Sequence, residues 1–219
     1  IRKLNSENKR VLFEGAQGAL LDVDQGTYPY VTSSNCSPAG IASGAGIGPH
    51  DIDYILGVVK AYVTRVGEGP MPTEIDDAIG EKIAIEGGEV GATTGRPRRC
   101  GWFDAVSVKR VIESNSVSAL CLTNMDVLDF LDEIKICVDY RFTDDAEIFS
   151  ECMDLETSQP EYISCKGWKQ SIKGINKIEE LPREAIDFYK KIEELCGISV
   201  DVISTAPDDA GTIMLNQSI

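Results

Sequence analysis

Short apolar segments alternate with amphipathic ones along most of this chain, and that alternation restricts the folds open to it. Apolar or alternating patterns predict strands over residues 11–14, 62–66, 118–122, 134–140 and 198–203. Apolar residues at helical spacing predict helices over 51–62, 76–86, 102–113 and 182–196, with a short helix at 19–22. We therefore expect an α/β fold: one continuous domain over residues 1–219, with a mixed sheet flanked by helices and ligand loops at the strand ends.

Two stretches lack a clear pattern. Residues 32–48 are polar and rich in glycine, and residues 142–162 are acidic and weakly patterned. We expect the acidic stretch to be an exposed excursion from the fold. The chain begins at Ile1 and enters a strand-like segment almost at once, which indicates a piece cut from a longer protein.

The composition disfavours several classes of function. Lys and Arg number 21 against 36 Asp and Glu, a formal net charge of −15, which disfavours nucleic acid and anionic membranes as partners. We expect neither a membrane span nor a secretion leader. The seven cysteines are scattered, which favours a reducing cytoplasmic location over a disulfide scaffold or a zinc site. His50 is the only histidine, so a histidine-rich metal site or a Ser-His-Asp triad has little to draw on.

A short basic stretch interrupts this acidic chain. Residues Gly91–Trp102 hold two threonines, three glycines and the arginines Arg96, Arg98 and Arg99. Glycines let the backbone approach a ligand, and planar guanidinium groups suit carboxylate or phosphate. This composition predicts an anion site, with a solvated basic loop as the equally weighted alternative.

Other polar loops follow predicted strands, at Gly15–Gly18, Thr32–Asn35, Thr123–Asp126 and Ser204–Ala206. Loops that leave the carboxyl ends of strands gather along one edge of an α/β sheet, so these loops and the basic one could line one cleft. Each is weak evidence alone, because Gln17 could cap a turn and Thr32 could satisfy a local backbone group.

The segment Thr123–Asp126 allows two interpretations. The Asp126 carboxylate could accept two hydrogen bonds from guanine, or it could cap a helix that begins at Val127, and the residues alone favour the cap. The Gly-rich run Gly40–Gly48 lacks the lysine and the helix context of a phosphate-binding loop. The sequence therefore predicts a place for anions, and for a base as the less favoured reading of Asp126, without a triphosphate cradle.

Five motifs taken in order closely resemble the adenylosuccinate synthetase family. They are collinear, extend over nearly the whole chain and comprise Phe13–Gly18, Gly26–Pro29, Val31–Asn35, Thr93–Trp102 and Val202–Thr205. The similarity corresponds to roughly the carboxyl-terminal half of that family. It implies a fragment of a larger P-loop-like nucleotide-binding domain.

The resemblance implies a two-step ligation of purine nucleotide biosynthesis. The γ-phosphoryl group of GTP passes to O6 of IMP, and the amine of L-aspartate displaces it to give adenylosuccinate, GDP and phosphate. Mg²⁺ assists the first step. The phosphate loop, the catalytic acid and base, and the expected Mg²⁺ ligands lie in the amino-terminal half. We therefore expect this chain to be inactive alone, and the full-length protein to be a cytoplasmic homodimer.

The resemblance also assigns residues. Gln17 and Thr32 would contact IMP, with Gln17 near the reacting 6-position. Arg96 would touch IMP and aspartate, and Arg98 would reach between aspartate and GTP. The loop closing on aspartate would consist of Ala92, Thr93, Thr94, Gly95, Arg96, Pro97 and Arg98. Guanine would be held from two sides by Asn124, Met125, Asp126, Ser204, Thr205 and Ala206.

Three positions depart from the family's usual residues. Asn124 stands where lysine is usual, Ala206 where glycine is usual and Asp209 where arginine is usual. The Asn124 amide can still donate to guanine O6 but carries no charge, which brings the strength of nucleotide binding into question. The alternatives to a ligase fragment are a non-catalytic nucleotide-binding or assembly module, and a phosphoryl-transfer enzyme of other specificity.

Overall fold

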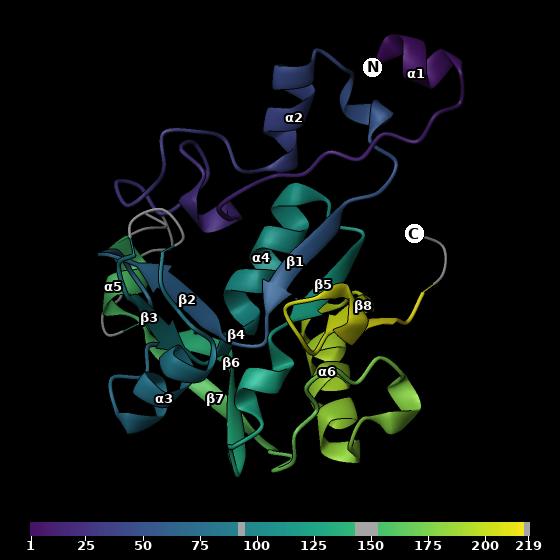
Figure 1. Cartoon of the computed structure of the whole chain (residues 1–219). Coiled ribbons are helices and arrows are strands. Elements are labelled where there is room, and N and C mark those ends of the chain that lie inside the picture. Colours follow the sequence, from purple (N-terminus) through teal and green to yellow (C-terminus); the bar gives the residue numbers. More distant parts are fainter. Residues whose placement is uncertain (92–94, 143–152, 217–219) are drawn as a thin grey trace.

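A computed structural model describes residues 1–91, 95–142 and 153–216 of the chain. Strands and helices alternate over most of its length, as Figure 1 shows. In chain order the α-helices and 3-10 helices (η) are α1 (Arg2–Ser6), η1 (Ala19–Leu21), α2 (Pro38–Ala45), η2 (Pro49–Asp51), α3 (Ala78–Glu86), α4 (Ala105–Asn115), η3 (Met125–Leu128), α5 (Met153–Thr157), η4 (Ile178–Glu180), α6 (Arg183–Cys196) and η5 (Asp209–Gly211). The strands are β1 (Leu56–Lys60), β2 (Val63–Val66), β3 (Arg98–Gly101), β4 (Phe103–Asp104), β5 (Ala119–Thr123), β6 (Glu133–Arg141), β7 (Gln159–Lys166), β8 (Val200–Ser204) and β9 (Thr212–Met214).

The described strands form three sheets. The largest has the order β1-β5-β8-β9, in which β1, β5 and β8 are parallel and β9 is antiparallel. A second sheet, β4-β6-β7, pairs β4 parallel and β7 antiparallel with β6. The third is the antiparallel pair β2-β3. The α/β class and the mixed sheet flanked by helices are confirmed, but the β-structure is divided among three sheets where one was expected.

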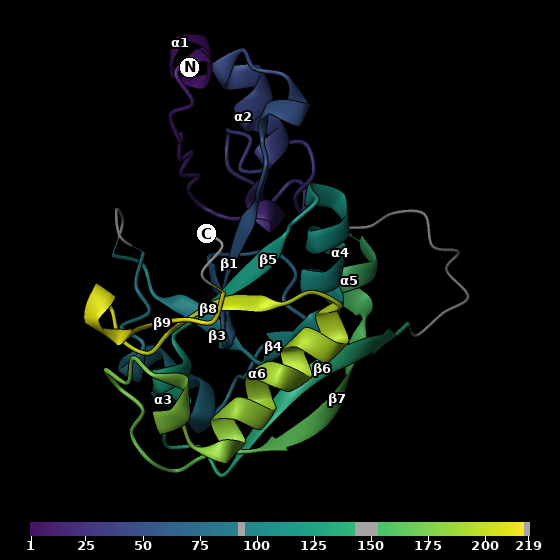
Figure 2. The same cartoon turned by 90° about the vertical axis from the view of Figure 1, so that its right-hand side faces the viewer.

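Helices α4 and α6 pack against each other and against the β4-β6-β7 sheet, and Figure 2 shows α6 lying across it. The α6 helix buries one face, which includes Phe188 and Ile192, as its amphipathic sequence predicts. The left-handed backbone of Gly197, at φ 75°, ends the helix. The other helix, α4, begins where the Asp104 carboxylate accepts a hydrogen bond from the Ser107 N–H at 3.0 Å.

The amino-terminal segment, with α1 and α2, lies above the three sheets in both Figure 1 and Figure 2. The buried guanidinium of Arg65, on β2, fastens part of this segment to the sheets. Its Nη2 donates to the Thr27 hydroxyl at 2.9 Å and to the Tyr30 carbonyl at 2.7 Å. Residues far apart in sequence are thereby joined beside β2.

Two predicted elements in the first sixty residues are wrong. Residues 11–14 form no strand, and Leu12 is 91% exposed, because no strand of the described chain pairs with this apolar run. The predicted helix over 51–62 is replaced by η2 and the strand β1, which pairs residue for residue with β5. Gly57 explains part of this outcome, because a side chain there would approach Val117 to 2.8 Å. Close packing of β1 on its neighbour outweighs the helical spacing.

The expected excursion over 142–162 is also corrected in its second half. Residues 159–162 belong to β7, which pairs with β6 in a regular antiparallel register, whereas 143–152 lie outside the described residues. The remaining predicted elements are found as β2, α3, α4, β5, β6, α6 and β8, and the predicted short helix is η1. The polar passage 32–48 contains α2, which the sequence did not predict.

Candidate functional site

Three parallel strands end at the same edge of the largest sheet. Lys60 at the end of β1 is paired with Thr123 at the end of β5, and the N–H of Ala61 donates to the Thr123 carbonyl at 2.9 Å. On the other side of β5, Leu122 is paired with Ile203 of β8. The loops after β5 and β8 therefore leave the sheet side by side, as predicted for the carboxyl ends of parallel strands.

The first of these loops holds Asn124, Met125 and Asp126. Asn124 adopts left-handed backbone angles (φ 59°) and occupies the position before η3, without a side-chain cap. Met125 is fully buried in the core. The interpretation of Asp126 as a helix cap is wrong, because Asp126 lies inside the first turn of η3 and Asn124 occupies the cap position.

The Asp126 carboxylate lies in a partly buried position. Its pKa is raised by burial and by the nearby charge of Asp129, while the charge of Lys173 acts in the opposite direction. A partly dehydrated carboxylate beside the sheet edge is suited to accept paired N–H donors from a planar ligand.

The second loop, Ser204–Ala206, is tightly bonded within the protein. The buried Thr205 hydroxyl donates to the Ile175 carbonyl at 2.7 Å, and the backbone N–H of Thr205 donates to the Gly211 carbonyl at 2.9 Å. The Ser204 hydroxyl donates to the Ala206 carbonyl at 2.8 Å. The Thr205 side chain therefore shapes the loop, and contacts from this loop to a ligand would come mainly from its backbone and from Ser204.

The basic loop is a hairpin closed by backbone hydrogen bonds. The N–H of Arg98 donates to the Glu89 carbonyl at 3.0 Å, and the N–H of Gly91 donates to the Arg96 carbonyl at 2.7 Å. Gly95 has φ 63°, a left-handed conformation that glycine adopts without strain. Gly95, Arg96 and Pro97 are exposed at its tip, whereas the predicted residues Ala92, Thr93 and Thr94 lie outside the described residues.

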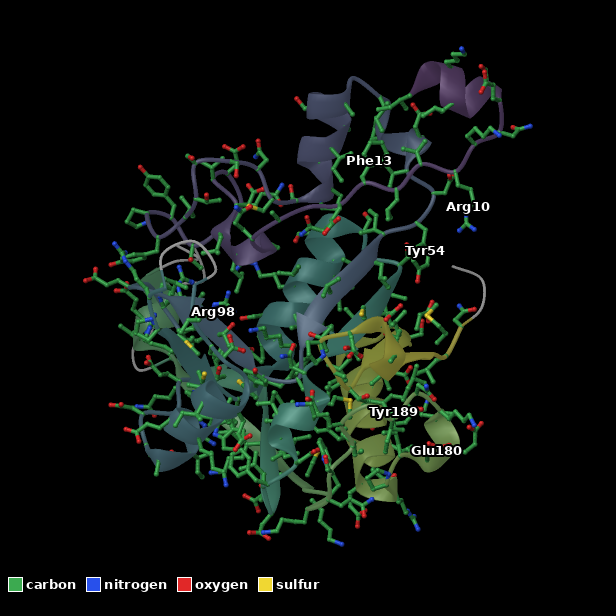
Figure 3. The ribbon with its side chains drawn as sticks, viewed as in Figure 1. Arg10, Phe13, Tyr54, Arg98, Glu180 and Tyr189 are labelled. Carbon is green, nitrogen blue, oxygen red and sulfur yellow. The ribbon has the colours of Figure 1, made fainter. Side chains whose placement is uncertain are left out.

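The base of the hairpin contains a buried charge cluster that the sequence did not reveal. The Glu89 carboxylate accepts from Lys60 Nζ at 2.6 Å, from the Tyr62 hydroxyl and from Arg98 Nη1 at 2.8 Å. Burial raises the pKa of Glu89, but the three donors outweigh it and hold the pKa below its usual value. Arg98, labelled in Figure 3, thus starts β3 with its guanidinium bonded to the cluster.

The predicted residues Gln17 and Thr32 lie in the amino-terminal segment. Gln17 is exposed and has left-handed backbone angles (φ 64°), and its side chain lies beside Cys36. The N–H of Thr32 donates to the Leu21 carbonyl at 2.8 Å. The described contacts therefore place Gln17 beside Cys36 and Thr32 beside Leu21, within the amino-terminal segment.

A second buried carboxylate, also missed by the sequence analysis, organises these loops. Asp22 is wholly buried, and its Oδ1 accepts from the N–H groups of Asp24 at 2.9 Å and Gln25 at 3.1 Å. Its Oδ2 accepts from the N–H groups of Cys36 at 2.6 Å and Ser37 at 3.0 Å. Burial raises the pKa of Asp22, but the four backbone donors dominate and lower it.

The described part of the chain shows neither a metal cluster nor a membrane-spanning helix. Within residues 1–91, 95–142 and 153–216, no three or more His, Cys, Asp or Glu side chains gather so that they could hold a metal ion. The side chains of those residues therefore do not fit a Mg²⁺ site. None of the helices in those same residues is long and apolar enough to cross a membrane.

Comparison with known proteins assigns the family. The family model described as adenylosuccinate synthetase matches residues 1–213. The chain belongs to the adenylosuccinate synthetase family. The adenylosuccinate synthetases of Hahella chejuensis and Edwardsiella ictaluri are each 52% identical over 218 residues, which cover 98% of this chain and 50% of each relative. The structure of fully ligated adenylosuccinate synthetase from Plasmodium falciparum has a TM-score of 0.92 at 38% identity, covering 97% of this chain and 52% of that one.

The chain therefore spans about half the length of the curated relatives it matches. The shares are lengths rather than positions, so the correspondence to the carboxyl-terminal half of the family and to a P-loop-like domain stays a prediction. The assignment of individual site residues also stays a prediction, because these matches concern the fold and the family.

Sequence reasoning missed Lys60, Glu89 and Asp22 for a common reason. Each is a charged residue beside an apolar strand or a turn, which by itself is typical of a protein surface. One local feature pointed to Glu89, since it lies two residues before the start of the Gly-rich basic stretch at Gly91. Its partners Lys60 and Tyr62 are 29 and 27 residues away, and only the pairing of strands brings them together.

Proposed function

We propose that this chain carries the IMP, aspartate and guanine loops of a GTP-dependent ligase that makes adenylosuccinate in purine nucleotide biosynthesis. The observation that carries the proposal is the meeting of the Asn124–Asp126 and Ser204–Ala206 loops at the edge of β5 and β8, in a chain of this family. The charged hairpin stands at the neighbouring end of β1, where Glu89 joins Lys60 to Arg98.

In this proposal the sheet edge binds the base of GTP. The Asp126 carboxylate accepts from the N1–H and 2-amino groups of guanine, and the Asn124 amide donates to O6. Adenine cannot satisfy the same carboxylate, because it lacks both donors at those positions. Met125 supports the loop from the core, and Ser204–Ala206 close the site from the other side.

The hairpin binds the amino acid. The exposed Arg96 grips the carboxylate of L-aspartate, and Arg98 spans the amino acid and GTP, with Ala92, Thr93, Thr94, Gly95 and Pro97 forming the rest of the loop. Gln17 and Thr32 hold IMP with its 6-position toward the incoming amine. Catalysis by these residues is mainly positioning, since the amine must displace the phosphoryl group from O6 of the activated purine.

Other catalytic groups of the proposed enzyme lie outside this chain. The family's acid, base, phosphate loop and Mg²⁺ ligands belong to the half of the relatives that this chain does not span, so the chain alone does not turn over. The full-length protein is a cytoplasmic homodimer that binds neither nucleic acid nor membranes. The net charge of −15 supports the last statement.

The test is an assay of adenylosuccinate formation from IMP, GTP, L-aspartate and Mg²⁺. The full-length product of the reading frame that encodes this chain should be active, and residues 1–219 alone should show only background. If the full-length protein binds IMP and GTP but makes no adenylosuccinate, the ligase proposal is wrong and a non-catalytic nucleotide-binding or assembly module is favoured. Turnover by residues 1–219 would show that the proposed division of catalytic groups is wrong.

A further inference from the structure

The cluster around Glu89 combines deep burial with an excess of positive charge. The Glu89 side chain is 1% exposed, whereas those of Lys60 and Arg98 are 26% and 28% exposed. Two cations share one carboxylate, so the cluster keeps one net positive charge. Burying a carboxylate in this way is costly unless its oxygens are fully bonded, and here Lys60, Tyr62 and Arg98 all donate to it.

Arg98 is held by Glu89 at two points. Its backbone N–H donates to the Glu89 carbonyl at 3.0 Å, and its Nη1 donates to Glu89 Oε2 at 2.8 Å. Nothing in residues 1–91, 95–142 and 153–216 accepts a hydrogen bond from Nε or Nη2 of Arg98. One edge of the planar guanidinium is therefore fixed in the protein, and the other edge remains for an oxyanion.

Lys60 has a related arrangement on the other side of the carboxylate. Its Nζ donates to both Glu89 oxygens, at 2.6 and 2.8 Å, and to the Thr64 hydroxyl at 3.1 Å. The end of β1 is thereby joined to the base of the hairpin, and the orientation of Arg98 becomes fixed relative to the sheet edge.

We propose that Glu89 is a positioning residue, which holds Arg98 so that the unbonded edge of its guanidinium faces the oxyanion groups of aspartate and GTP. This rests on the proposed function, in which Arg98 binds those two substrates. Glu89 itself contacts neither substrate. Its effect passes through Arg98, and Lys60 and Tyr62 keep the carboxylate charged and fixed while the hairpin binds ligand.

The experiment compares Glu89→Gln with Glu74→Gln in the full-length protein. Glu74 provides a matched control because it pairs with the neighbouring arginine, Arg99, at 2.7 Å and lies outside the cluster. Glutamine keeps the size of the side chain but removes the charge that holds Arg98. Glu89→Gln should raise the KM for aspartate and for GTP roughly tenfold, the loss expected for one charge-assisted hydrogen bond. The KM for IMP and the values for Glu74→Gln should stay within about twofold of wild type, as expected for sites that Arg98 does not contact.

A double-mutant cycle separates positioning from general stability. In an Arg98→Ala background, Glu89→Gln should add no further rise in the KM for aspartate, because its effect passes through Arg98. Additive effects, or equal changes in all three KM values, would overturn the proposal. If Glu89→Gln does not fold, Glu89→Asp replaces it. The shorter aspartate side chain keeps the negative charge but holds it farther from Arg98. The KM values for aspartate and GTP are therefore again expected to rise, and unchanged values would overturn the proposal.

The two proposals fail in different ways. Loss of adenylosuccinate synthesis in the wild-type full-length protein would refute the proposed function. An active wild type whose Glu89→Gln variant keeps its KM values for aspartate and GTP would refute the positioning role alone.

Discussion

Replacing Asp22 by asparagine is expected to loosen the loops that carry Gln17 and Thr32. In the structure both carboxylate oxygens are used, and each accepts from two backbone N–H groups. An asparagine has only one such oxygen. Whichever way the amide is turned, its NH₂ group faces two backbone donors, which lose their acceptor and confront another donor.

The structure sets the size of the effect. Two hydrogen bonds to a charged group are lost, each worth about 1.5–3 kcal/mol, and relaxation of the two loops recovers part of this. We expect the local free energy of opening to fall by about 2–4 kcal/mol, or roughly thirtyfold to a thousandfold faster amide exchange at Cys36 and Ser37. Asp24→Asn is the matched control, because Asp24 is exposed and its carboxylate accepts from the Asn35 side-chain amide and from no other group in the described part of the chain.

Hydrogen exchange followed by NMR provides the measurement, with a pH series alongside. The pKa of Asp22 is lowered in the folded protein, so its stabilisation is complete above its ordinary value of about 4 and is lost progressively as the pH falls from there through the lowered value. Protection of Cys36 and Ser37 should therefore weaken gradually below about pH 4 in the wild type and be weak at every pH in Asp22→Asn. Unchanged exchange at these two amides in the variant would refute the reasoning.

The remaining predictions concern the two halves of the proposed ligand site. Arg96→Lys in the full-length protein should lower kcat/KM for aspartate roughly tenfold to a hundredfold and kcat/KM for GTP by less. Lysine lacks the planar guanidinium that binds a carboxylate through two hydrogen bonds, and the loss of one such charged hydrogen bond costs about 1.5–3 kcal/mol. An unchanged dependence on aspartate would remove Arg96 from the site. Asp126→Asn should shift the substrate ratio from GTP toward xanthosine triphosphate, whose 2-oxo group accepts from the new amide, and a constant ratio in steady-state assays would exclude base recognition by Asp126. Thr205→Val should lower the free energy of unfolding by about 1–3 kcal/mol in urea denaturation, because the carbonyl of Ile175 loses its buried donor, while Thr205→Ser should retain most of the stability; equal losses in both variants would contradict this.

The sequence predicted best those helices and strands whose ends are marked by local residues such as proline, glycine or a capping side chain. Pro182 and Gly197 predict the bounds of α6 within a few residues, and apolar spacing predicts α4, although the predicted start at residue 102 precedes the observed cap Asp104. The segment 51–62 had helical spacing of apolar residues but contains Gly57 and two valines, and pairing with β5 made it a strand. Local periodicity cannot report such long-range pairing.

The candidate site likewise contains residues that local sequence indicates and residues that only the fold brings together. The glycines and arginines of the hairpin lie close together in sequence, so composition alone marks residues 91–99 as a candidate anion site, with a solvated basic loop as the equally weighted alternative. The roles of Glu89 and Asp22 could not be predicted, because some of the donors that bond their carboxylates come from residues distant in sequence. The cap at Asp126 could be excluded only from the structure, because η3 begins at Met125, two residues before the predicted start at Val127.

Three buried charged residues, Asp22, Arg65 and Glu89, lie beneath the loops of this protein. Asp22 and Glu89 each receive at least three donors, and the buried guanidinium of Arg65 donates to Thr27 and Tyr30. An ionised group buried with every bond made fixes the direction of its partners, whereas the loss of one partner leaves it costly to bury. Substitutions at Asp22 or Glu89 should therefore act first on loop geometry and substrate affinity, and only secondarily on the packing around Phe188 and Ile192. The proposed ligand loops thus depend on residues that need never touch a ligand.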